Sequence, residues 1–126
     1  MPYIMNKKRL QVEQLDRKLQ TFAAATKVMP PSRGWVRAIR RSLGMSLHQL
    51  GAKVGITKQS VGELERREQE GSITLNTLRE AAHALDMELV YAVVPRDGSL
   101  DALIERKARE MAMRIVSRTS KQMQLE

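Results

Sequence analysis

The residues best placed to do chemistry are the polar side chains that follow Thr57, namely Lys58, Gln59 and Glu63. Glutamine can pair bidentately with adenine N6 and N7, lysine can donate to guanine O6 or N7, and glutamate can accept from cytosine N4. In an isolated helix such residues would be ordinary surface polarity, but at the start of a helix that enters the major groove they favour base contact. The predicted base contacts are therefore Lys58, Gln59, Gly62 and Glu63. Glu63 could instead orient a neighbouring cation. Gly62 offers no side chain, which reduces the number of bases that the helix can read.

Hydroxyls, helix-start amides and basic side chains around this segment suit phosphate oxygens, which position a protein on DNA without reading sequence. The residues expected to contact phosphates lie between residues 46 and 67. The predicted phosphate contacts are Ser46, Lys53, Thr57, Ser60, Arg66 and Arg67.

Residues 45–65 must position these side chains, and their pattern predicts a helix-turn-helix. A first helix opens at Ser46, where Gln49 three residues on completes a capping box. Gly55 suits a left-handed helix end, because glycine has no Cβ to clash. Thr57 is a good N-cap for the second helix, which we expect to run to about Arg67. The apolar stripes of the two helices are Leu47, Leu50 and Val54, then Val61 and Leu64.

Charge is unevenly distributed along the 126 residues, whose net charge is +8. Residues 33–67 hold eight basic and two acidic side chains, whereas residues 68–95 hold one basic and five acidic ones. The positive excess thus coincides with the predicted helix-turn-helix, as attraction to DNA phosphates requires. A generic basic protein with a solvated face is the alternative explanation of the charge alone.

Other chemistries find little support in the composition. The absence of cysteine excludes disulfides and thiolate metal sites, and the two histidines, His48 and His83, are far apart. No nucleophile–base pair or phosphate-cradling glycine loop is present, so we expect no enzyme, cofactor or metal. No apolar run approaches the ~20 residues of a membrane span, and the basic start lacks the apolar region of a secretory signal. We expect a soluble, cytoplasmic protein, nucleoid-associated when bound to DNA.

Helical periodicity extends to both sides of the motif. Residues 6–26 show a seam at Val12, Leu15, Leu19 and Phe22, which could pack on its own domain, on a dimer mate or on a dedicated partner. Pro30 and Pro31 break this pattern. Further helices are predicted over residues 34–43, over residues 75–85 after a Thr74 cap, and after Ser99, with a fraying polar tail beyond Arg118.

A β-favouring run precedes Pro95 and changes the character of the chain. No second strand is visible, so the simplest partner is the same strand of a second subunit, antiparallel across a two-fold axis. The predicted dimer strand consists of Glu88, Leu89, Val90, Tyr91, Ala92, Val93 and Val94.

The expected fold is mainly all-α, in three parts. Residues 1–32 form an N-terminal helix and proline linker, residues 33–86 form the helix-turn-helix domain, and residues 87–126 form the strand and a C-terminal helix for dimerisation or partner contact.

Residues 34–86 resemble the lambda-repressor-like Xre family of helix-turn-helix regulators, a five-helix fold. The resemblance is carried by Arg40, Leu43-Gly44-Met45-Ser46, Gln49-Leu50-Gly51, Val54-Gly55-Ile56-Thr57, Gln59-Ser60-Val61 and Leu64-Glu65. It implies a structural ion pair between Arg40 and Glu65. The sequence departs from the family at Gly51, where an alanine is usual, and we expect this to cost some helix propensity but no chemistry.

A narrower resemblance covers most of the chain. The segments 31–40, 71–75, 82–86 and 89–95 are similar to the family labelled mobile mystery protein A, whose members are associated with a neighbouring Fic-domain protein. This implies an antitoxin-like partner of a Fic-domain protein that represses its own operon. A strand followed by a helix is also similar to HipB-type antitoxins, which dimerise through that strand. The inhibitory motif Ser/Thr-x-x-x-Glu-Gly/Asn of some Fic antitoxins is missing, because Arg66 stands four residues before Glu70-Gly71.

Two function hypotheses follow. The first is a homodimeric repressor of a toxin–antitoxin operon that binds double-stranded DNA. The second is a protein-interaction module that binds the Fic-domain partner through the N-terminal helix or the helix after Ser99, with DNA binding secondary.

Overall fold

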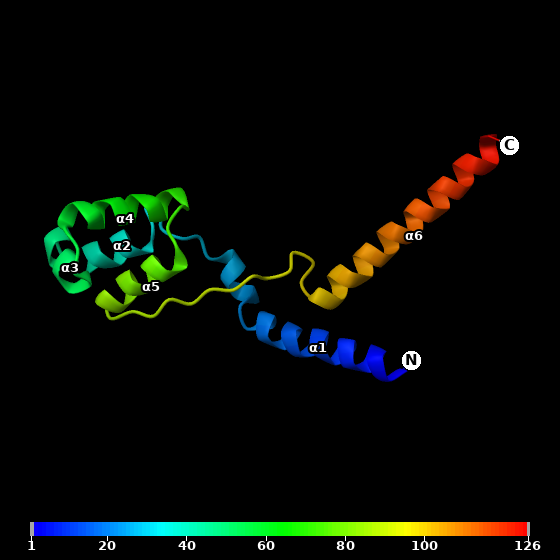
Figure 1. The fold of residues 1–126 in the computed structure, drawn as a ribbon, viewed down its shortest axis with the longest axis horizontal. Helices are drawn as coiled ribbons and strands as arrows, with labels where there is room; N and C mark the ends of the chain where they lie inside the picture. The colour runs from blue at the N-terminus through cyan, green and yellow to red at the C-terminus, as the bar shows by residue number, and fades with distance from the viewer. Residues whose placement is uncertain (1, 126) are drawn as a thin grey trace. The chain divides into compact units, whose positions relative to one another are not determined.

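The computed structural model describes residues 2–125, which are mainly helical, as predicted. The chain divides into two compact units, one of residues 29–91 and one that combines residues 1–28 with residues 92–126. The elements, labelled in Figure 1 where there is room, are α1 (Pro2–Gln20), the 3₁₀ helix η1 (Ala23–Lys27), α2 (Trp35–Ser42), α3 (Leu47–Val54), α4 (Lys58–Glu70), α5 (Leu75–Ala84) and α6 (Leu100–Leu125).

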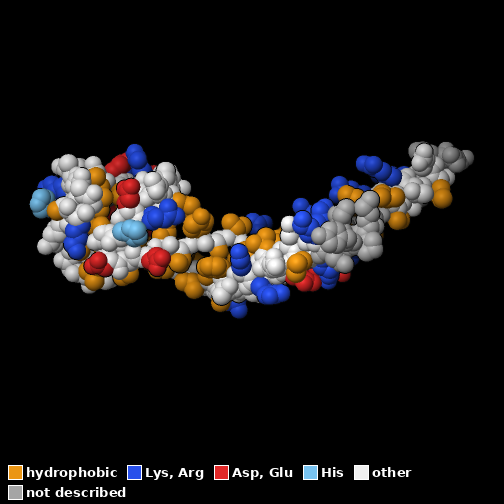
Figure 2. Space-filling view, turned by 60° about the horizontal axis from the view of Figure 1, so that its bottom comes forward, with side chains coloured by type: hydrophobic (Ala, Val, Ile, Leu, Met, Phe, Trp, Pro, Cys, Tyr) orange, Lys and Arg blue, Asp and Glu red, His pale blue; other side chains and the backbone are white. Residues whose placement is uncertain are grey.

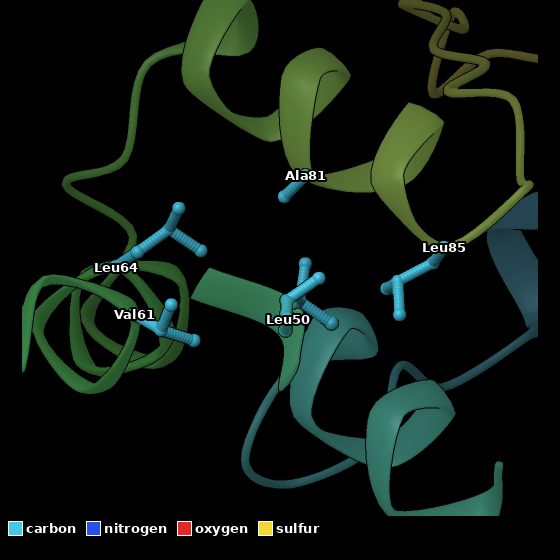
Figure 3. Close-up of a cluster of buried hydrophobic side chains, with 6 residues drawn as sticks. Leu50, Val61, Leu64, Ala81 and Leu85 are labelled. Atoms are coloured by element: carbon cyan, nitrogen blue, oxygen red, sulfur yellow. The ribbon is translucent and has the colours of Figure 1, made fainter. Parts of the chain in front are cut away.

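The unit of residues 29–91 is built from α2, α3, α4 and α5 around one hydrophobic core. Figure 3 shows side chains from α3, α4 and α5 pointing toward one another, with Leu50 between the other helices. Leu50 and Val61 are completely buried. Burying a side chain of this size contributes about 1.5–3 kcal/mol. The core residues are Val36, Leu50, Val61, Leu64, Ala81 and Leu85.

The caps predicted for the helix-turn-helix are present. Ser46 Oγ accepts from the amide of Gln49 at 3.0 Å, and the Gln49 side chain accepts from the amide of Ser46 at 2.8 Å. Gly55 ends α3 in the left-handed region with φ of 88°. Thr57 Oγ1 accepts from the amide of Ser60 at 3.1 Å and caps α4. The turn therefore has hydrogen-bonded helix ends on both sides.

Several helix ends differ from the sequence-based boundaries. The first helix ends at Gln20, and residues 23–27 form a tighter 3₁₀ turn, because the chain must leave the helix before Pro30. The second helix of the predicted helix-turn-helix, α4, continues past Arg67 to Glu70 and ends at Gly71, whose φ is 80°. The prediction of a fraying tail after Arg118 is wrong for the described residues, since α6 continues to Leu125.

The predicted strand is not formed within the described chain. The segment Glu88, Leu89, Val90, Tyr91, Ala92, Val93 and Val94 lies between α5 and α6 without regular secondary structure. A strand needs a neighbour for its amides and carbonyls, and residues 2–125 of a single chain offer none. The side chains of Val90, Tyr91 and Val93 are 73%, 61% and 83% exposed, so this apolar segment remains uncovered.

The second unit joins the two ends of the chain through α1 and α6. Asp16 of α1 accepts from the backbone amides of Leu100 at 2.7 Å and Asp101 at 3.2 Å, at the start of α6. The Gln20 side-chain amide donates to the Gly98 carbonyl at 2.8 Å. As predicted, Ser99 also caps α6. From Ile104 onward the described side chains of α6 are exposed, and hydrophobic and basic side chains lie side by side along the helix (Figure 2).

None of the helices in the described part combines the length and apolar character that crossing a membrane requires.

Candidate nucleic-acid interface

The start of α4 presents two polar side chains to solvent. Lys58 and Gln59 are exposed in the first turn of the helix, directly after the Thr57 cap. Neither side chain has a hydrogen-bond or ion-pair partner among the residues that the structure describes. Both are therefore free to meet an external ligand without breaking an internal contact.

The two hydroxyls at this helix start are joined to each other. Thr57 Oγ1 donates to Ser60 Oγ at 3.0 Å while it accepts from the Ser60 amide. In this arrangement the Ser60 hydroxyl proton remains available to an acceptor such as a phosphate oxygen.

Glu63 lies within a network of arginines on the exposed face of α4. Its carboxylate binds Arg66 through two hydrogen bonds and lies 3.4 Å from Arg67 Nε. The hydrogen bond from Arg66 is the main reason that the pKa of Glu63 lies below its usual value. Arg66 also binds Glu70 at 3.0 Å. In the free protein, Glu63 therefore orients neighbouring cations, and Arg66 and Arg67 are held by carboxylates.

The remaining predicted phosphate contacts belong to α3 and its start. Ser46 is exposed, although its oxygen already accepts from the Gln49 amide. Lys53 is exposed in the last turn of α3, and no carboxylate within the described residues pairs with it. Lys53 thus offers a free charge near the turn.

A buried ion pair fixes α4 against α2. Arg40 Nε lies 2.6 Å from Glu65 Oε2, and Arg40 Nη2 donates to Glu65 Oε1 at 3.1 Å. A third donor, Arg40 Nη1, binds the Met45 carbonyl at 2.9 Å. The residues are only 8% and 7% exposed. This bidentate arrangement joins α2, the start of the helix-turn-helix and α4.

A second carboxylate of α4, Glu68, has a role that the sequence analysis missed. Its oxygens accept from the backbone amides of Trp35 at 2.7 Å and Val36 at 2.9 Å, so Glu68 caps the start of α2. The N-cap residue Gly34 has no side chain to do so, and its φ is 95°. A Cβ at Gly34 would lie 2.8 Å from the Glu68 carboxyl carbon. A helix without an N-cap side chain was the only signal for this contact in the sequence.

Gly51 also has a role beyond helix propensity. A Cβ added at this position would lie 2.6 Å from the carbonyl oxygen of Ile56. The turn therefore packs directly against the backbone of α3, which an alanine would obstruct. The sequence did not predict this close packing at Gly51.

Comparison with models of known families also indicates a helix-turn-helix. Residues 36–91 match the family model HTH_3, described as helix-turn-helix. Residues 36–91 thus form a helix-turn-helix domain of the lambda-repressor-like type, a class of domain that is typical of DNA-binding regulators. Neither the curated proteins nor the solved structures gave a match to this chain.

Proposed function

We propose that this protein is a sequence-specific transcriptional repressor that binds double-stranded DNA as a homodimer. The observation that carries the proposal is the start of α4. Lys58 and Gln59 are exposed there and have no partner among the described residues, and the helix is fixed by its cap and by the Arg40–Glu65 pair. Side chains that read base edges need free hydrogen-bond donors and acceptors and a rigid helix to hold them.

The dimer supplies the second half of the binding site. Two copies related by a two-fold axis would place two α4 helices about one DNA turn apart, ~34 Å, on a pseudo-palindrome. The exposed apolar segment of residues 88–94 supports pairing between subunits, since it has the sequence of a strand and lacks a partner within the described chain.

The operon context follows from the resemblance to mobile mystery protein A. On that basis the protein is an antitoxin-like regulator of its own operon, acts in the cytoplasm on nucleoid DNA, and is encoded beside a Fic-domain protein. Because the chain lacks the known inhibitory motif, control of the partner's synthesis is the route that this proposal assigns to it.

A gel shift with the full-length protein tests the proposal. DNA from upstream of its own gene is compared with random duplex at ~150 mM salt. We expect binding that survives competitor in the parent and fails in the double variant Lys58→Ala, Gln59→Ala. Arg79→Ala, which removes a charge from the exposed surface of α5, is the matched control. Equal binding to both duplexes would refute the proposal.

A protein-interaction function is the second candidate, and the exposed helix α6 favours it. Ile104, Met111 and Ile115 are exposed and lie on one stripe of this helix, whereas Met113 points to the opposite side. If this stripe binds the Fic-domain partner, Met111→Glu should abolish capture of that purified partner and leave the gel shift intact. Met113→Glu should change neither. Capture that survives Met111→Glu would exclude the stripe.

A further inference from the structure

A hollow between α2 and α4 is lined by more positive charges than the neighbouring carboxylates neutralise. It has a volume of about 240 Å³ and is open to solvent. Arg33, Arg37 and Arg66 line it, with Gly62 and Gln69 on the α4 side. At about 30 Å³ per water molecule, it has room for a phosphate group with several waters. We call these five residues the arginine hollow.

Two of these arginines have no carboxylate partner among the described residues. Arg40 and Glu65, which also border the hollow, neutralise each other, and Arg66 binds Glu63 and Glu70. Among the described residues, no carboxylate lies within ion-pair distance of Arg33 or Arg37. The pKa of Arg37 is lowered, first by partial burial and then by the neighbouring charges of Arg33 and Arg41. An anion placed here would relieve this repulsion.

The position of the hollow links it to the DNA-reading surface. Gln59, Gly62, Arg66 and Gln69 are spaced three or four residues apart along α4, so they share one face of the helix. The hollow thus begins one turn after the proposed base contact at Gln59. The bare backbone at Gly62, where nothing lies within 4 Å of an added Cβ, leaves the entrance open.

We propose that the arginine hollow binds a phosphate group and that, in the DNA complex, this group belongs to the DNA backbone beside the half-site. Arg37 and Arg33 supply the free positive charges, and Arg66 can exchange a carboxylate for a phosphate oxygen. This extends the proposed function, because it assigns a phosphate contact to α2, a helix to which the sequence analysis gave only a structural arginine.

Inorganic phosphate tests the chemistry of the site without DNA. Phosphate is titrated into the full-length protein at constant ionic strength, and the NMR signals of the arginine Nε–Hε groups are followed. We expect a saturable shift that Arg37→Gln abolishes. Arg41→Gln removes the same charge from the same helix but from outside the hollow, and should keep the shift. No saturable shift, or equal loss in both variants, would overturn the proposal.

The salt dependence of DNA binding identifies the source of the phosphate. On random duplex, the slope of log K against log salt concentration should fall by about 1 in Arg37→Gln and stay unchanged in Arg41→Gln. Affinity should fall about three- to tenfold, as for one lost charge-assisted contact. Arg37→Lys keeps the positive charge and should show the same slope as the parent protein. Thermal melts establish that all variants are folded.

A phosphate shift with an unchanged slope would overturn the assignment to DNA and leave a site for a free phosphate ligand. The slope on random duplex does not depend on sequence preference. A protein without a preferred operator would therefore refute the proposed repressor while the arginine hollow could still pass its test.

Discussion

At the scale of single residues, the exposed face of α4 contains side chains in two different states. Lys58 and Gln59 bind no other side chain among the described residues, whereas Glu63 and Arg66 already bind each other. A free side chain can contact DNA at no internal cost, but an engaged one must first exchange its partner. The engaged residues should therefore control affinity, and the free ones should control sequence preference.

Glu63→Gln separates the two roles left open for this carboxylate. The substitution removes a negative charge and releases Arg66 and Arg67 for phosphates, so we expect DNA affinity to rise about three- to tenfold with a steeper salt dependence on every sequence. Glu70→Gln, which releases one contact of Arg66, is the control and should have a smaller effect. If Glu63→Gln instead weakened binding at one base pair only, Glu63 would be a base contact.

The two glycines of the helix-turn-helix should respond oppositely to alanine. In Gly51→Ala the new Cβ meets the Ile56 carbonyl, and overpacking of about 1–3 kcal/mol exceeds the ~1 kcal/mol gained in helix propensity. Gly62→Ala meets nothing within 4 Å and should gain up to ~1 kcal/mol. Urea unfolding of both variants measures this. An equally stabilised Gly51→Ala would show that the turn does not pack closely on α3.

At the scale of elements, sequence patterns predicted what depends on near neighbours in the chain. The cap residues Ser46, Thr57 and Thr74 and the left-handed Gly55 were readable because each acts within four residues. The capping contacts of Glu68 and Asp16 were not, because they reach backbone amides 32 to 85 residues away. No periodicity records a contact of that kind. The caps made by Glu68 and Asp16 therefore needed the structure, whereas the Arg40–Glu65 pair, 25 residues apart, was predicted from the family resemblance alone.

Removal of the Asp16 carboxylate should loosen the start of α6. In Asp16→Ala the amides of Leu100 and Asp101 lose their acceptor, at a cost of about 0.5–2 kcal/mol by analogy with other helix caps. Hydrogen exchange at these two amides should accelerate. Glu13→Ala, which removes a carboxylate whose one ion-pair partner among the described residues is the exposed Arg9, should leave exchange unchanged. Unchanged exchange in Asp16→Ala would contradict the cap.

At the scale of the whole molecule, the segment of residues 88–94 is mostly apolar and exposed, without regular secondary structure. Its β-branched and aromatic residues predict a strand, but a strand exists only when another strand binds it. The predicted strand is therefore absent from the described chain, in which residues 88–94 have no neighbouring strand. Its apolar side chains Val90, Tyr91 and Val93 are exposed.

A proline in this segment tests the proposed dimer. Val93→Pro removes a backbone donor that a paired strand would use, so we expect sedimentation equilibrium to show a monomer where the parent is a dimer. Val93→Thr keeps the β-branched shape and the donor, and should remain dimeric. A dimer that persists in Val93→Pro would locate the subunit contact elsewhere.

The attachment of α4 to α2 at two points has a consequence for the thermodynamics of DNA recognition. Because Glu65 and Glu68 attach this helix to α2 at two successive points, its entry angle is set during folding. Little conformational entropy then remains to be lost on contact with DNA, and association becomes the docking of a rigid body. Calorimetry should accordingly give a heat-capacity change that matches the interface alone, without the additional contribution of a segment that folds as it binds.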